Sequence, residues 1–234
     1  MAVAFDAVST TTGAAVTSTT HTHTPVGTPT LVSVSVTMRS GIGFTPPNTA
    51  TGVTYGGVSM TKQAHKDRGD ENNGSLDYWV LTSGVPTGAQ SVVVTLTTSD
   101  NVVITARTYT GTNGSFGTAQ TSEGDTTSTG TATPAVSSAS GELVDDALYV
   151  SNVATGVAAA GGQTERSNLT NSVPNLRGAT SEAPGAASVT MSWTWSANGN
   201  GTFAHLAIPI QASSDAAPDA VIPRRSLIIP VRMY

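Results

Sequence analysis

Residues 30–38, TLVSVSVTM, decide the fold class, because apolar and small polar side chains alternate strictly along them. This is the period of a β-strand with one buried face and one solvent-facing side. The apolar face holds Val32, Val34, Val36 and Met38. Residues 187–195, ASVTMSWTW, repeat the pattern, with Val189, Met191, Trp193 and Trp195 sharing a face. Both segments are therefore predicted to be half-buried antiparallel strands.

Looser strand patterns continue through most of the chain. They cover 3–8, 51–55, 75–81, 90–98, 102–110, 147–153 and 202–211. Turn signals separate them, among them Gly56-Gly57 and Ser99-Asp100-Asn101. Residues 121–140 are rich in Thr, Ser and Gly and are predicted to be a long loop or weak edge strands. Many short strands predict an all-β, antiparallel two-sheet sandwich of jelly-roll type.

The composition supports this fold class and excludes several functions. The 39 Thr and 26 Ser residues carry most of the polarity, while only 11% of the residues are charged. Thr is β-branched and fits a pleated surface. A net charge of −5 with no basic run before the last dozen residues argues against nucleic-acid binding. The start, MAVAFDAVSTTTG, lacks the pattern of a signal peptide, and no run is long enough for a membrane span.

The character of the chain changes at Ala212. Residues 1–211 are predicted to form the sandwich domain, 212–220 a polar linker, and 221–234, VIPRRSLIIPVRMY, an extended C-terminal arm. The arm carries +3, whereas residues 1–220 hold seven basic and fifteen acidic residues, a charge of −8. Pro223 and Pro230 exclude a regular helix. We expect the arm to dock on another subunit, with its own sandwich as the alternative surface.

Several segments occur in a familiar order. AFDAVS begins at Ala4, LVSVSV at Leu31, VTYGGVSMT at Val53 and LDYWVL at Leu76. GVPTGAQSVVVTL, SVTMSWTWSA and AHLAIPI follow, the last ending at Ile210. This order resembles a group of jelly-roll, lectin-like β-sandwich domains in phage virion proteins and some bacterial surface proteins. The shared motifs mark strands and a YGG turn, and the resemblance brings no catalytic residues with it.

The resemblance implies a phage virion structural protein that is made in the host cytoplasm. Head decoration or a minor capsid role is the first expectation, and a tail component the second. The partners would be capsid or tail subunits and further copies of the chain, with no cofactor, membrane or nucleic acid. The arm residues expected to bind a partner are Val221, Ile222, Arg224, Arg225, Leu227, Ile228, Ile229, Val231, Arg232 and Tyr234. The alternative is a glycan-binding adhesion module on a phage or cell surface.

Metal binding has only weak candidates in the sequence. His21 and His23 would lie on one face of a strand, where a further histidine, His65 or His205, would complete a site. Asp67 and Asp70 belong to the acidic run DRGDENNG, whose oxygens would suit Ca²⁺. Neither set has diagnostic spacing. An exposed polar strand and a solvated hairpin loop are the favoured interpretations, so no metal is predicted.

Enzyme activity is not predicted either. Asp145 and Asp146 are adjacent, so on a strand they would face opposite sides and cannot flank one bond. The chain has no GxSxG nucleophile motif, no cysteine and no phosphate-binding Gly-Lys loop. Trp193 and Trp195 are expected in the core, and His205 is expected to point outward. Trp79 is the best candidate for an exposed ring and hence for glycan stacking.

Overall fold

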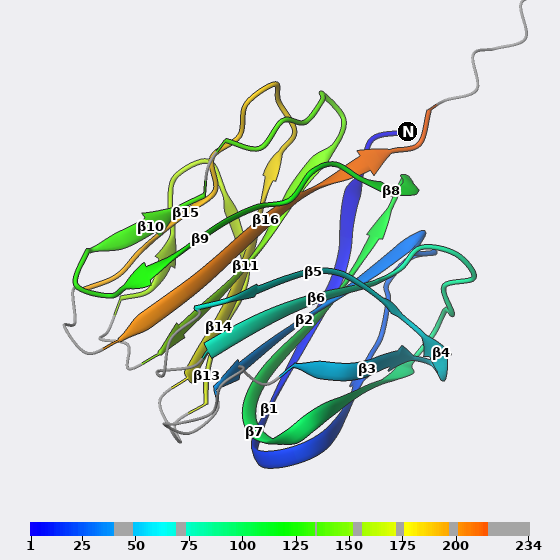
Figure 1. The fold of residues 1–234 in the computed structure, drawn as a ribbon. Coiled ribbons are helices and arrows are strands. Elements are labelled where there is room, and N and C mark those ends of the chain that lie inside the picture. Colours follow the sequence, from blue (N-terminus) through cyan, green and yellow to red (C-terminus); the bar gives the residue numbers. More distant parts are fainter. Residues whose placement is uncertain are drawn as a thin grey trace, which may run out of the picture.

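The computed structural model describes residues 1–39, 49–68, 74–133, 135–151, 156–171, 176–196 and 201–214. The chain is all-β with only antiparallel pairing among the described strands, which confirms the predicted fold class (Figure 1). The first strands are β1 (Ala4–His23), β2 (Leu31–Arg39), β3 (Ala50–Tyr55), β4 (Val58–Ser59), β5 (Thr61–Asp67), β6 (Gly74–Leu81) and β7 (Gln90–Thr110). They are followed by β8 (Thr112–Phe116), β9 (Gln120–Asp125), β10 (Gly130–Ala132), β11 (Leu143–Ser151) and β12 (Ala158–Ala159). The last are β13 (Thr164–Asn171), β14 (Leu176–Pro184), β15 (Ser192–Thr194) and β16 (Thr202–Ala212).

The strands form two large sheets, the first from the N-terminal half of the chain and the second from the C-terminal half. Strands β1 to β7 form the first sheet, in the order β4-β3-β7-β2-β6-β5 with β1 paired to β7. The second sheet has the order β13-β14-β11-β16-β8, with β9 also paired to β16. Contacts between the sheets run strand over strand, with β1 against β13, β7 against β14, and β6 against β11 and β16. The two sheets therefore pack face to face as a sandwich.

A third, small sheet covers the outer face of the second one. It consists of β10, β15 and β12, and it places Trp193 and Trp195 against Leu148 and Phe203. The central strands of the second sheet, β14, β11 and β16, consequently lie between two layers and are buried on both faces. The side chains between these layers include Val144, Ala183, Met191 and Ala207.

The long strands β1 and β7 bend and form part of two layers. Val16 pairs with Asp100 at irregular positions of the ladder, and beyond them both strands turn back beneath β2 and β6 (Figure 1). Ser9, in the first part of β1, hydrogen-bonds His23 in its last part. The bend closes a second core, which includes Val34, Val36, Met38, Val53 and Val94. The predicted turn at residues 99–101 is thus a corner within one continuous strand.

Burial on both faces corrects the prediction for β2. Ser33, Ser35 and Thr37 were expected to face solvent, but they are at most 3% exposed, because this face packs against the second sheet. The hydroxyl group of Thr37 donates to the Val103 carbonyl at 2.9 Å, and that of Ser33 lies 3.5 Å from Asp145 Oδ2 in the facing sheet. Short hydroxyl side chains tolerate this position because they bond neighbouring groups without needing water.

Other predictions are confirmed or adjusted. Gly56 and Gly57 adopt φ of 56° and 80° in the turn between β3 and β4, which only glycine accommodates easily. The prediction of weak edge strands within residues 121–140, one of the two alternatives, is confirmed by β9 and β10. Of residues 187–195, only Ser192–Thr194 form a strand, with an isolated bridge at Val189.

Candidate functional site

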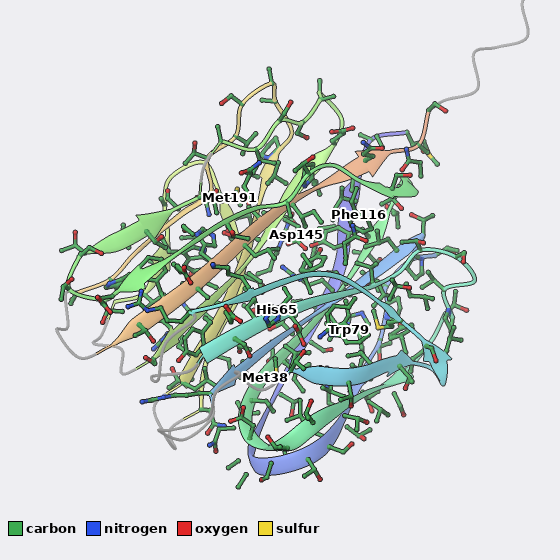
Figure 2. All side chains as sticks on the ribbon, in the orientation of Figure 1. Met38, His65, Trp79, Phe116, Asp145 and Met191 are labelled. Atoms are coloured by element: carbon green, nitrogen blue, oxygen red, sulfur yellow. The ribbon has the colours of Figure 1, made fainter. Side chains whose placement is uncertain are left out.

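A buried ion pair lies between the two large sheets. Arg107 on β7 donates from Nη1 to Asp145 Oδ1 on β11 at 2.5 Å, and both side chains are fully buried. Tyr78 on β6 donates to Asp145 Oδ2 at 2.5 Å, and Arg107 also donates to the Asp146 carbonyl at 2.9 Å. Burial raises the pKa of Asp145 to about 7, although the charge of Arg107 opposes the rise. None of the three side chains is exposed, so the cluster links the two sheets (Figure 2 labels Asp145).

A second buried cluster lies on the other side of the same strand. The Asp146 carboxylate accepts hydrogen bonds from the Ser181 amide at 2.6 Å and the Ser181 hydroxyl at 2.8 Å. Trp193 Nε1 donates to it at 2.8 Å and His205 Nε2 at 2.9 Å. The predicted outward position of His205 is wrong, since its exposure is 0%. The third sheet covers this face, and the prediction that Asp145 and Asp146 face opposite sides is confirmed.

A third cluster reaches the surface at the edge of the first sheet. The buried Asp77 carboxylate on β6 accepts from His65 Nδ1 at 2.6 Å, from Lys62 at 2.9 Å and from the Ala50 amide at 2.8 Å. His65 is about one third exposed, and its Nε2 lies 3.4 Å from Asp67 Oδ2. The hydrogen bond to Asp77 raises the pKa of His65, whereas burial opposes this. The cluster ties β3 and β5 to β6.

The His65 contact gives a pH-dependent stability. A raised pKa means that the stabilisation is fully present below about pH 6.5 and is lost as the pH rises through the higher value of the folded state. In the unmodified protein, His65 is expected to lower the free energy of unfolding by about 0.5 kcal/mol between about pH 6 and pH 8, a small change because the ring is partly exposed. Replacing His65 by Gln should remove this change. Urea unfolding curves at several pH values measure it.

His21→Gln provides a comparison of opposite sign for this pH series. Burial, together with His23, lowers the pKa of His21 to about 4, so the folded protein keeps His21 neutral throughout the range tested. The unfolded chain protonates it below about pH 6.5, so its replacement should raise stability at pH 6 relative to pH 8, opposite to the change in His65→Gln. If the His65→Gln curve runs parallel to that of the unmodified protein, the pKa of His65 does not differ between the folded and unfolded states.

The histidines His21 and His23 come together at Ser9 and not at a metal site. Ser9 Oγ lies 3.2 Å from His21 Nε2 and 2.8 Å from His23 Nδ1. His23 Nε2 lies 3.2 Å from Thr108 Oγ1, and the Thr108 hydroxyl donates to Asp6 Oδ2 at 2.7 Å. Burial lowers the pKa of His23, although Asp6 opposes this. The threonine separates the carboxylate from the imidazole, so Asp6 does not contact the ring as in a Ser-His-Asp triad.

The acidic metal candidates lie elsewhere. Asp67 ends β5 at the opposite edge of the first sheet from β1, and Asp70 lies outside the described residues. In the described ranges, no group of three or more His, Asp or Glu side chains is close enough together to hold a metal ion. In the same ranges, no helix is long and apolar enough to cross a membrane.

Trp79 does not offer an exposed ring, and that prediction is wrong. Its side chain is 7% exposed and packs in the core of the first sheet with Val34 and Met60 (Figure 2). Lys62 covers the ring, with Nζ 5.1 Å from the centroid. Alternation placed Trp79 opposite Tyr78, but both faces of β6 are buried. Among the described residues, every Trp and Tyr side chain is buried.

A shallow groove of about 380 Å³ lies between the end of the first sheet and β8. Its lining combines apolar side chains with hydroxyl and amide groups and contains no charged residue. Phe116, the one aromatic ring in the lining, is half-buried. The lining offers hydrogen-bonding groups to a neutral polar ligand such as a sugar, but it lacks an exposed flat ring.

The two ends of the described chain meet at one corner of the sandwich. The Met1 amino group donates to the Ser213 carbonyl at 2.9 Å, and Ser213 donates from its amide to the Gly111 carbonyl at 2.8 Å. Strand β16 ends at Ala212, so the end of the described chain lies beside the start of β1 (Figure 1). The predicted partner-binding residues, Val221 to Tyr234, lie outside the described residues.

Comparison with known proteins adds no relative. A scan of protein-family models and searches of curated proteins and of solved structures found no match to this chain. The functional assignment therefore depends on the chain's own residues.

Proposed function

We propose that this protein is a structural component of a phage particle that assembles through its C-terminal arm. Head decoration or a minor capsid role is the first assignment, and a tail component the second. The observation that carries the proposal is the charge contrast between an acidic body and the apolar arm with three arginines that follows it. Opposite charge steers association, and aliphatic side chains in the arm supply area to bury on a partner.

The clusters in the body support a scaffold more than an enzyme. The ion pair Arg107–Asp145 and the Asp146 cluster are fully buried, and both carboxylates accept hydrogen bonds from side chains of facing strands. The corner at Met1 and Ser213 supports assembly through the arm, since the described residues that precede the linker and arm are held on the body. The adhesion alternative is less well supported, because its aromatic candidate, Trp79, is buried.

Removal of the arm tests the proposal. A chain ending at Ser214 keeps the contact between Met1 and Ser213 and is expected to retain the melting temperature of the full chain, but to be lost from phage particles. Sedimentation of particles, followed by detection of the bound protein, measures this. A full-length variant with residues 221–234 replaced by Gly and Ser is the matched control for length, and it should also be absent. Normal incorporation of either chain would overturn the proposal.

A further inference from the structure

The first part of β1 has an open edge with which no described strand pairs, although β13 of the facing sheet packs against this part of β1. β1 pairs only with β7, on one side. At one end of this edge Arg166 stacks on Phe5, 3.8 Å from the ring centroid, and at the other Asn171 Nδ2 donates to the Gly13 carbonyl at 2.8 Å. Between these contacts, Ala7 to Thr12 run in regular register with β7. We call residues 7–12 the open edge.

The open edge lacks the features that normally protect a sheet edge. Its sequence, AVSTTT, has no charge and no proline, and Val8, Thr10 and Thr12 are exposed. Free strands usually carry lysine, proline or a bulge, or lie under another segment, because unpaired N–H and C=O groups attract other strands. The open edge is therefore suited to accept one more strand.

Three other edges of the large sheets are guarded. The β5 edge is joined to β9 by the ion pairs Lys66–Glu123 at 3.0 Å and Arg68–Asp125 at 2.7 Å. The edge of β3 is covered by β4 and by the Met60 amide, which donates to the Val53 carbonyl at 2.9 Å. β13 carries the charged pair Glu165 and Arg166. β8 (Thr112–Phe116) is a further uncharged end strand, but it is shorter and its register with β16 is irregular. Among the described strands of these sheets, β1 thus offers the longest uncharged edge in regular register.

We infer that the open edge binds the C-terminal arm of a second copy of this chain by strand addition, an inference that rests on the proposed function. Residues 224–229, RRSLII, are six residues bounded by Pro223 and Pro230. Six residues is a typical strand length and matches the open edge, and prolines suit the ends of an added strand because they cannot donate to the ladder. The +3 arm also complements the acidic body of the copy that receives it.

A second copy fits better than the arm's own body. Ser213 lies beside the start of β1, so an arm running directly from there along its own open edge would be parallel to β1. The described pairings of β1 and β7 are all antiparallel, and parallel pairing is slightly less stable. An arm from another copy approaches without this constraint.

The absence of cysteine makes a disulfide test direct. Full-length Thr10→Cys and full-length Ser226→Cys are mixed under mild oxidation, and linked peptides are identified by mass spectrometry. We expect a mixed dimer joined through positions 10 and 226, in a yield about tenfold above the control, because docking raises the local thiol concentration. The control replaces Thr10→Cys by Thr61→Cys, an exposed position on the guarded β5 edge. Equal yields from both mixtures would overturn the inference.

Two further samples separate the outcomes. The double variant Thr10→Cys/Ser226→Cys should form dimers and larger chains; a disulfide within one chain, independent of concentration, would place the arm on its own body and overturn the second-copy assignment. In a third sample, the chain with Thr12→Cys is mixed with Ser226→Cys, with and without the additional substitution Thr10→Lys. The lysine should lower the yield of the linked dimer severalfold, because its charge repels the basic arm. A particle defect of the chain ending at Ser214 without any linkage would leave the proposed function standing and remove only this inference.

Discussion

Replacing Arg107 by Met is expected to lower the free energy of unfolding by about 3–5 kcal/mol at neutral pH, since removing one partner leaves Asp145 buried without its counter-charge. Tyr78 and Ser33 remain as donors to the carboxylate, but they do not replace the positive charge. Urea unfolding followed by tryptophan fluorescence measures the loss. The sheets meet at this pair, so the variant should also unfold in a single transition at lower urea.

The pH dependence of this loss provides an internal check. Burial already raises the pKa of Asp145 to about 7, and without Arg107 it rises further. A raised carboxyl pKa means that stability falls as the pH increases from the unfolded value of about 4 towards the folded one. The deficit should therefore be smaller at pH 5 than at pH 8.

The double variant Arg107→Met/Asp145→Leu removes both charges and is the matched control. Replacement of a buried pair by apolar residues is often neutral or stabilising, so it should recover most of the loss. A single variant that loses less than about 1 kcal/mol would mean that the pair is more hydrated than the described burial implies.

Replacing Asp146 by Ala is expected to cost about 3–5 kcal/mol and to loosen the small third sheet first. The substitution leaves the Ser181 amide, Trp193 Nε1 and His205 Nε2 buried without their acceptor, at about 1–3 kcal/mol for each group before relaxation. Trp193 belongs to β15, the central strand of the third sheet, so its anchor to the second sheet is lost. Hydrogen exchange of residues 192–194, compared with that of β11, measures the difference.

Asp146→Asn is the matched control because it keeps one carbonyl acceptor and nearly the same volume. The Asn variant should lose less stability than Asp146→Ala. Its remaining loss arises because the side-chain NH₂ group faces donors at Trp193 and His205 and cannot accept their hydrogen bonds. Unchanged exchange at residues 192–194 in the Ala variant would show that the apolar contacts of Trp193 hold the third sheet by themselves.

The sequence predicted the fold class and most strands, because alternation in β2 and turn residues between strands are local signals. The sequence misplaced side chains on strands whose second face is covered by another sheet. Alternation assigned Ser33 and His205 to solvent, yet each packs beneath another sheet. Period 2 separates the two faces of a strand but does not tell which face meets water.

The candidate clusters were mostly hidden from sequence reasoning. Arg107 and Asp145 are 38 residues apart and meet only because β7 and β11 lie in facing sheets. The corner at Ser99–Asn101 carries ordinary turn residues, but here they bend β7 without reversing it. One feature of these clusters was predictable from the sequence: Asp145 and Asp146 point to opposite faces, because they are adjacent on a strand.

The position of β16 has a mechanical consequence for a body tethered by its C-terminus. β16 is an interior strand, paired with β11 along one side and with β8 and β9 along the other. A force transmitted through Ser213 along the strand axis would load both ladders in shear, so many hydrogen bonds would share the tension at once. A tether on an outer strand such as β13 would instead peel its ladder apart one bond at a time.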